Sequence, residues 1–186
     1  MMLKKWIVLI GIALTACTAP TDRLALKPLP SALELRPLVS SAMVRTVSLP
    51  TYAAVEEIAV ETSTGLIASN QDVLWADDPE RAVTLIVTQT LADILNTEIG
   101  PDPWPFLGLP DIAIDIRVAR MLAGADGVFR LTGQYYVGGD GIDFPNSTRA
   151  FNITQAMPDQ SLQSIAAAQS AALLTLSEQI ARSLAR

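Results

Sequence analysis

The chain has 186 residues, half of them hydrophobic, with 13 basic and 19 acidic side chains, no histidine and a single cysteine. Without histidine it lacks the usual general base, the commonest metal ligand and the centre of a Ser-His-Asp triad. One cysteine cannot form a disulfide or a zinc cluster within the chain, and the acidic balance argues against binding nucleic acid. We therefore expect a protein that binds or assembles, with no catalytic residues, no metal and no cofactor.

The first 17 residues have the layout of a secretory signal peptide. Lys4 and Lys5 precede an apolar run over residues 6–13 that is too short to span a bilayer. The run leads to Leu14-Thr15-Ala16-Cys17, which resembles the lipobox of bacterial lipoproteins. This resemblance implies that residues 1–16 are removed, that Cys17 carries diacylglyceryl and palmitate, and that residues 17–22 are the lipidated cysteine and a short tether. The alternative, an ordinary signal or a short membrane segment, does not use the cysteine.

Residues 23–186 have the length of a single α/β domain. Alternating apolar residues predict strands at 43–49 and 57–61, and the second forms a hairpin with a short strand at 66–69. A helix is predicted from Asp78 to about Asn96, because an N-cap oxygen is followed by proline and glutamate. One of its faces is a stripe of apolar side chains and is expected to be buried.

The second half of the chain predicts a hairpin and a closing helix. Residues 100–110 hold four prolines and two glycines and are expected to be irregular. Strands follow at 112–121, 128–137 and 149–155, then an alanine-rich helix over 161–184 whose buried stripe includes Leu176 but not Ser177. The predicted class is α+β, with an antiparallel or mixed β-sheet and two amphipathic helices packed on one face, preceded by a cleaved lipoprotein signal peptide.

Two acidic groups and a glycine cluster are the only candidates for chemistry. The acidic groups would have to converge on a pocket to act as acids, bases or metal ligands, and helix capping and strand alternation explain them better. The glycines lack the following helix and lysine that a phosphate-binding loop needs, so a turn is the better interpretation. The residues are Asp77, Asp78 and Glu80; Asp111 and Asp115; and Gly138, Gly139 and Gly141 around Asp140.

Three motifs resemble the ABC-type transport auxiliary lipoproteins, and within them the paraquat-inducible protein C type. They are VRTVSLPTY at residues 44–52, IASNQDVLWA at 67–76 before a helix, and DGVFRL at 126–131 in a hairpin, followed by the alanine-rich helix. The sequence departs from the family at residues 24–26, where an aromatic pair is usual, and at Ala53, where leucine is usual.

The resemblance implies a non-catalytic outer-membrane lipoprotein on the periplasmic face. It would be an accessory subunit of an MCE-type intermembrane phospholipid transport system, would bind the periplasmic MCE-domain protein, and could form a homo-oligomeric ring. Thr18 after the cysteine, where no aspartate stands, is consistent with sorting to the outer membrane. The alternative is a lipoprotein that regulates a cell-envelope enzyme such as a peptidoglycan synthase, but such a regulator needs a longer tether to reach through the wall.

The proline-rich segment at 100–110 supplies the candidate partner surface. Its prolines restrict the backbone, so Trp104, Phe106 and Leu107 could be displayed at low entropic cost, as interfaces prefer. The alternative is that these side chains fold back and cover the sheet edge or the end of the first helix.

Overall fold

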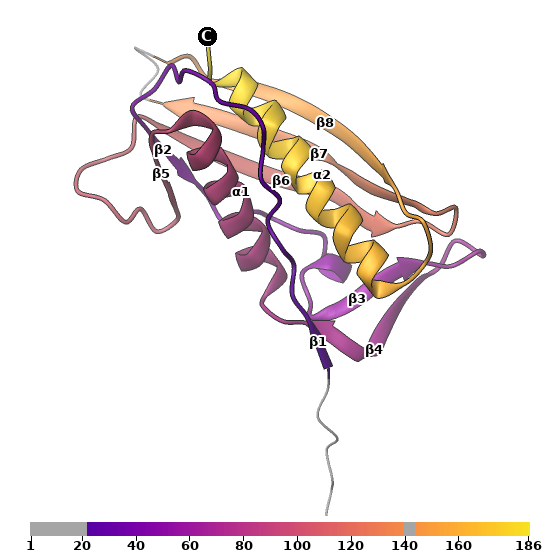
Figure 1. Cartoon of the computed structure of the whole chain (residues 1–186). Helices are drawn as coiled ribbons and strands as arrows, with labels where there is room; N and C mark the ends of the chain where they lie inside the picture. The colour runs from indigo at the N-terminus through magenta and orange to yellow at the C-terminus, as the bar shows by residue number, and fades with distance from the viewer. Residues whose placement is uncertain (1–21, 140–143) are drawn as a thin grey trace, which may run out of the picture.

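The computed structural model describes residues 22–139 and 144–186, which form an eight-stranded mixed sheet with two helices on one face (Figure 1). The predicted class and the placement of both helices are confirmed. The predicted signal peptide, Cys17 with tether residues 18–21, Asp140 and Gly141 lie outside the described residues. The elements are β1 Asp22–Leu24, β2 Ser41–Val44, the 3-10 helix η1 Thr51–Ala53, β3 Glu57–Glu61, β4 Ile67–Trp75, α1 Pro79–Leu95, β5 Glu98–Pro101, β6 Ile112–Ala123, β7 Val128–Gly139, β8 Ser147–Ala156 and α2 Leu162–Ser183.

Strand β6 lies at the centre of the sheet and uses both of its edges. On one edge it pairs antiparallel with β7, which in turn pairs antiparallel with β8. The other edge is divided between two parallel partners: β2, with β5 beyond it, and β3, which joins where Val60 meets Ala123 and leads on to β4 and β1. The parallel pairs of β2 and β3 with β6, and of β2 with β5, place strands from the first third of the chain beside strands from its second half.

The strand predicted at 43–49 is displaced: β2 begins two residues earlier and ends five residues earlier. The later residues still run beside β6, but helix α1 takes some of their backbone donors. Val47 N–H donates to the Thr84 hydroxyl at 2.9 Å, and Leu49 N–H donates to the Glu80 carboxylate at 3.1 Å. These bonds fasten the start of α1 to the sheet and replace the regular ladder.

The prediction that residues 100–110 are irregular throughout is wrong at their start. Gly100 and Pro101 close strand β5, which pairs in parallel with β2. Because β5 is the last strand on its side of the sheet, the missing N–H of a proline is tolerated there. The remainder, residues 102–110, is a loop as predicted.

Helix α1 has the ends that its sequence predicts. The Asp78 side chain accepts a hydrogen bond from Arg81 N–H at 2.8 Å, and Pro79 occupies the first helical position. Asn96 ends the helix in the left-handed conformation, with φ 47°. The predicted apolar stripe is buried, and its members are Val83, Val87, Leu91, Ile94 and Leu95.

The DGVFRL motif builds the turn between β6 and β7. Gly127 has φ +77°, and the Asp126 carboxylate accepts hydrogen bonds from Val128 N–H and, at 2.9 Å, from the Arg130 guanidinium. A Cβ at Gly124 would come within 2.5 Å of both the Asp126 and Arg130 side chains, so the ion pair lies over a glycine. The motif is therefore a structural signature of the turn.

Helix α2 is buried on more of its surface than one stripe predicts. Leu176 is buried as expected, but Ser177 is buried too, and its hydroxyl donates to the Leu173 carbonyl at 2.9 Å. The prediction that Ser177 is exposed is wrong because α2 contacts both the sheet and α1. A second stripe of small residues is thereby covered; it comprises Ala166, Ser170, Ser177 and Ala181.

Residues 25–38, here called the N-terminal strap, run from β1 over the outer side of both helices (Figure 1). Leu35 N–H donates to the Ile94 carbonyl at the end of α1, and Leu38 N–H donates to the Leu184 carbonyl at the end of α2. The Ser31 hydroxyl donates to Glu178 of α2. The strap thus closes the helical layer on the side away from the sheet.

Substitution of Leu176 by aspartate should destabilise the fold by several kcal/mol, because a charge would be buried without a partner. Ala167→Asp is the matched control, since Ala167 is exposed on the same helix, and should change stability by about 0.5 kcal/mol or less. Chemical denaturation of both variants measures the difference. Equal losses would show that the buried side of α2 is misassigned.

The Asp126 carboxyl should titrate far below an ordinary aspartate. The hydrogen bond from Arg130, with further bonds from the turn, lowers the pKa of Asp126 to about 2, against about 3.9 for an unperturbed aspartate. A depressed pKa favours the folded state above about pH 3.9, and that contribution disappears as pH falls through about 2. In Arg130→Met, NMR of the carboxyl carbon should show the pKa rising; Arg117→Met should leave it unchanged.

Candidate functional site

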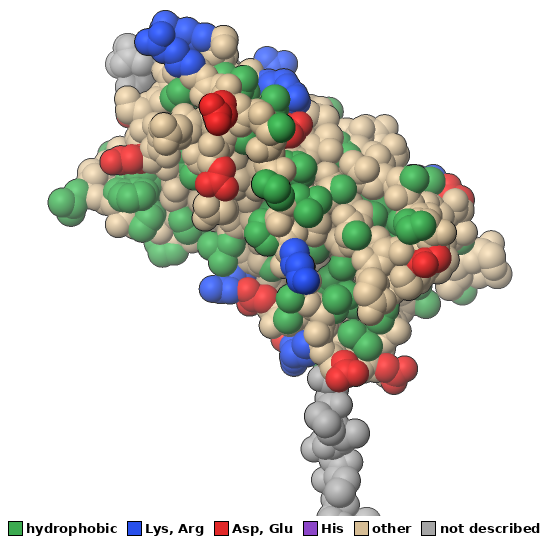
Figure 2. Space-filling view, viewed as in Figure 1, with side chains coloured by type: hydrophobic (Ala, Val, Ile, Leu, Met, Phe, Trp, Pro, Cys, Tyr) green, Lys and Arg blue, Asp and Glu red, His purple; other side chains and the backbone are tan. Residues whose placement is uncertain are grey.

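The loop of residues 102–110, here called the β5–β6 loop, carries the most exposed large apolar side chains of the described chain. Leu107 and Leu109 have relative exposures of 104% and 92%, and Phe106 is 44% exposed. Figure 2 shows hydrophobic side chains gathered on the protruding part of the surface that this loop forms. Apolar side chains clustered in this way mark a contact surface more often than scattered ones do.

The base of the loop is held against the sheet by close packing. A Cβ at Gly100 would lie 2.7 Å from the Pro105 ring and 3.2 Å from Phe106. The loop therefore approaches β5 so closely that only glycine fits at position 100 without a shift of the loop. Trp104 meets Phe106 edge to face, with ring centroids 4.9 Å apart. The loop therefore presents Leu107 and Leu109 from a fixed base.

The position of Trp104 bears on the two interpretations of the loop, in which its large side chains are either displayed to a partner or folded back onto the domain. Its ring is half-buried, and its indole N–H is shielded from solvent with no acceptor among the described residues. Leaving such a donor unpaired costs about 1–3 kcal/mol. Trp104 thus belongs to the base of the loop, whereas Leu107 belongs to its displayed part.

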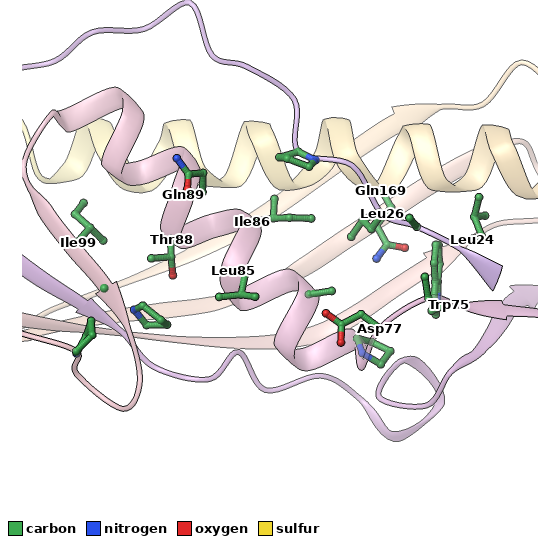
Figure 3. A pocket seen from close by; sticks show the side chains of 18 of the residues that line it. Leu24, Leu26, Trp75, Asp77, Leu85, Ile86, Thr88, Gln89, Ile99 and Gln169 are labelled. Carbon is green, nitrogen blue, oxygen red and sulfur yellow. The ribbon is translucent and has the colours of Figure 1, made fainter.

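A groove of about 720 Å³, here called the α1 groove, runs along helix α1 from β1 to the β5–β6 loop. Its volume falls within the range of about 300–1,000 Å³ typical of small-molecule sites. Figure 3 shows side chains from several elements around it. Leu24 and Leu26 come from β1 and the strap, Trp75 from β4, and Leu85 and Ile86 from α1.

The two ends of the groove differ in charge. At the end formed by β1, Arg23 donates to Glu56 and to the Trp75 carbonyl, both at 2.9 Å, and Arg81 pairs with Asp77. The other end is made of Ile99, Gly100, Pro101, Pro105 and Phe106, none of which carries charge.

The acidic candidates have structural partners and do not converge. Asp78 caps α1, and Glu80 accepts from Leu49 N–H. Asp111 accepts from the backbone N–H groups of residues 40 and 41. Asp115 pairs with Arg117, whose hydrogen bond lowers the pKa of the Asp115 carboxyl. In the described ranges no three His, Cys, Asp or Glu side chains lie close enough together to hold a metal ion.

The structure brings Trp104, Phe106 and Leu107 together in one loop, and Cys17 lies outside the described residues. Leu109 and the α1 groove were not predicted. Leu109 could have been added, because it stands two residues after Leu107 within the same proline-rich stretch. No local signal predicts the groove, since its walls come from distant parts of the chain. Neither described helix has the length and apolar character needed to cross a membrane.

Comparison with known proteins identifies the family. Solved structures with similar folds include an uncharacterized protein, 19% identical, covering 89% of this chain and 100% of its own with a TM-score of 0.72. Another is protein XCC0632 from Xanthomonas campestris, assigned to the DUF330 family. It is 18% identical, the match covers 89% of this chain and 92% of that protein's chain, and the TM-score is 0.63. A further match is a PelC dodecamer from Paraburkholderia phytofirmans. It is 12% identical, the match covers 84% of this chain and 96% of the PelC chain, and the TM-score is 0.46.

The first two structures support the fold alone. Among proteins with curated descriptions none matches this sequence. The model of the ABC-type transport auxiliary lipoprotein component family matches residues 27–181, which span nearly the whole described chain. The chain therefore belongs to the ABC-type transport auxiliary lipoprotein family.

Proposed function

We propose that this protein is a non-catalytic, lipid-anchored subunit of an intermembrane phospholipid transport system of the MCE type, most similar to the paraquat-inducible protein C branch of its family. Cys17 anchors it in the outer membrane on the periplasmic side, and the β5–β6 loop binds the periplasmic MCE-domain component. The observation that carries the proposal is the display of Leu107 and Leu109 on a loop packed against β5, in a chain of a transport-auxiliary family.

The position of the loop suits a partner that approaches from the periplasm. Asp22 is the fifth residue after Cys17, so the start of β1 lies within about 18 Å of the proposed lipid attachment point. The β5–β6 loop lies beyond the other end of the α1 groove, more than two helical turns of α1 away from β1. The anchor and the partner surface are therefore separate.

The same loop could instead join copies of this chain in a homo-oligomeric ring. Leu107 and Leu109 are uncharged and need a complementary apolar surface, which either a neighbouring copy or the MCE-domain protein could supply. The experiments below distinguish these two partners because oligomeric state and partner recovery are measured separately.

Leu107→Glu with Leu109→Glu should abolish partner binding and leave the fold intact. The full-length lipoprotein is co-expressed with a tagged MCE-domain protein of the same organism and purified in detergent. Recovery of the double variant should fall about tenfold or more, while its melting temperature stays near the wild-type value because both side chains are exposed.

Leu66→Glu is the matched control: this leucine is also exposed but lies in the turn between β3 and β4, and it should keep full recovery. Unchanged recovery of the double variant would contradict the assignment of the loop. So would a change in oligomeric state with full partner recovery, because the loop would then join copies of this chain.

Cys17→Ser should prevent anchoring, because the thiol is the proposed site of diacylglyceryl transfer. Radioactive palmitate should label the wild-type protein and not the variant, and the variant should appear as precursor or soluble protein. Wild-type protein without label would refute lipidation. Fractionation of labelled wild-type protein with the inner membrane would refute only the outer-membrane assignment.

A further inference from the structure

The α1 groove has the length of one lipid acyl chain. Its lining residues on α1 extend from Pro79 to Gln89, which corresponds to about 15 Å of helix. The hydrocarbon core of a bilayer is about 30 Å thick, so a single acyl layer is also about 15 Å deep. The groove is therefore shorter than the hydrocarbon core of a whole bilayer and long enough for one acyl chain, which occupies a single leaflet.

The walls of the groove are apolar over the part nearest the β5–β6 loop. Leu85 and Ile86 of α1 and Ile99 of β5 line the groove there (Figure 3). Phe106 of the loop also lines it. The nearby polar groups are already engaged: the Thr88 hydroxyl donates to the Thr84 carbonyl at 2.8 Å. This part of the groove can be filled by hydrocarbon without leaving a new buried polar group unpaired.

A buried amide lies at the opposite end. Gln169 of α2 is only 4% exposed and lines the groove, and Figure 3 shows its amide between Leu26 and Trp75. Within the described ranges no hydrogen bond joins this amide to another group, and its atoms are not fully sealed from solvent. An amide N–H placed there can donate to the ester carbonyl of a glycerolipid.

Charges of both signs surround the mouth of the groove beyond Gln169. Of the charged residues at this end, Asp77 lines the groove and pairs with Arg81. Arg23 pairs with Glu56 and donates to the carbonyl of the lining Trp75, and Lys27 stands in the sequence between the lining residues Leu26 and Pro28. Lys27 forms no ion pair with any described residue. A phosphate fits the cations and an ammonium fits the carboxylates, so the mouth matches a zwitterionic headgroup.

The mouth of the groove is also the part nearest the membrane. Leu24 ends β1 and Leu26 follows it in the strap, and β1 starts five residues after Cys17, within about 18 Å of the proposed lipid attachment point. A phospholipid leaving the membrane would thus meet the charged mouth first and the apolar end last.

We propose that the α1 groove binds one acyl chain of a zwitterionic glycerophospholipid from the membrane, with the ester at Gln169 and the headgroup at Arg23, Lys27 and Arg81. The inference rests on the proposed lipid-transport function and deepens it: the subunit itself takes up lipid and does not only position the transporter.

Tryptophan fluorescence tests the proposal directly. After removal of residues 1–16 the chain contains only Trp75, in the groove, and Trp104, in the loop, so Trp104→Phe leaves Trp75 as the single emitter. The full lipoprotein carrying this change is purified in detergent and mixed with phosphatidylcholine whose acyl chains are brominated. Bromine quenches at short range, and emission should fall at least twofold relative to unbrominated phosphatidylcholine.

Two groove variants and two controls test whether the quenching comes from lipid bound in the α1 groove. Leu85→Glu places a charge in the groove and Ala82→Phe fills it, and each should abolish the quenching. Leu66→Glu and Ala167→Phe are matched controls for charge and for size at exposed positions outside the groove, and both should keep the quenching in full. Quenching that survives in both groove variants, or none in the parent protein, would overturn the proposal.

Occupancy by the protein's own lipid is a separate outcome that also overturns it. In that case Cys17→Ser would be quenched by added brominated lipid and the lipidated parent would not. Failure of the proposed function is distinguishable, because Leu85→Glu should retain recovery with the MCE-domain protein while it loses quenching. If the loop variant loses partner recovery but is still quenched by brominated lipid, the two sites are separate and lipid binding is supported.

Discussion

Backbone hydrogen bonding on both edges of β6 is the constraint on which the other elements depend. Along one edge β7 pairs over almost the whole strand, and along the other β2, Ser48 and β3 succeed one another. Because both edges are occupied, the alternating residues of one face, Ile112, Ile114, Ile116 and Val118, are fixed as one buried row. The two helices cover this face, and the strap closes them from outside.

The elements with local signals were the predictable ones. The cap and stop of α1 and the glycine turn between β6 and β7 are read from a few adjacent residues, and each appears where the sequence indicates. Strand β5 was missed because its proline is acceptable only at a sheet edge, which depends on distant pairing with β2. Ser177 was misassigned for the same kind of reason: contact with α1 adds a second buried side to α2.

In the candidate site too, the features built from one stretch of sequence could be predicted, and those built from distant segments could not. A proline-rich stretch with large apolar residues predicts the β5–β6 loop as a candidate contact surface, and Leu107 is predicted from that stretch alone. The stretch does not indicate that Trp104 turns inward, since that depends on the packing of Pro105 over Gly100. The α1 groove combines β1, β4, α1, the loop and α2, and no single stretch of sequence contains its pattern.

The attachment of β1 also determines how the protein carries mechanical load. If Cys17 is anchored as proposed, a pull on the anchor would enter the described chain at Asp22 and load the three register pairs that join β1 to β4. Any remaining tension passes through the strap to the ends of α1 and α2, by way of Leu35 and Leu38. The β5–β6 loop comes later in the chain than these elements, so the proposed partner site would not carry the load that the proposed anchor places on β1 and the strap.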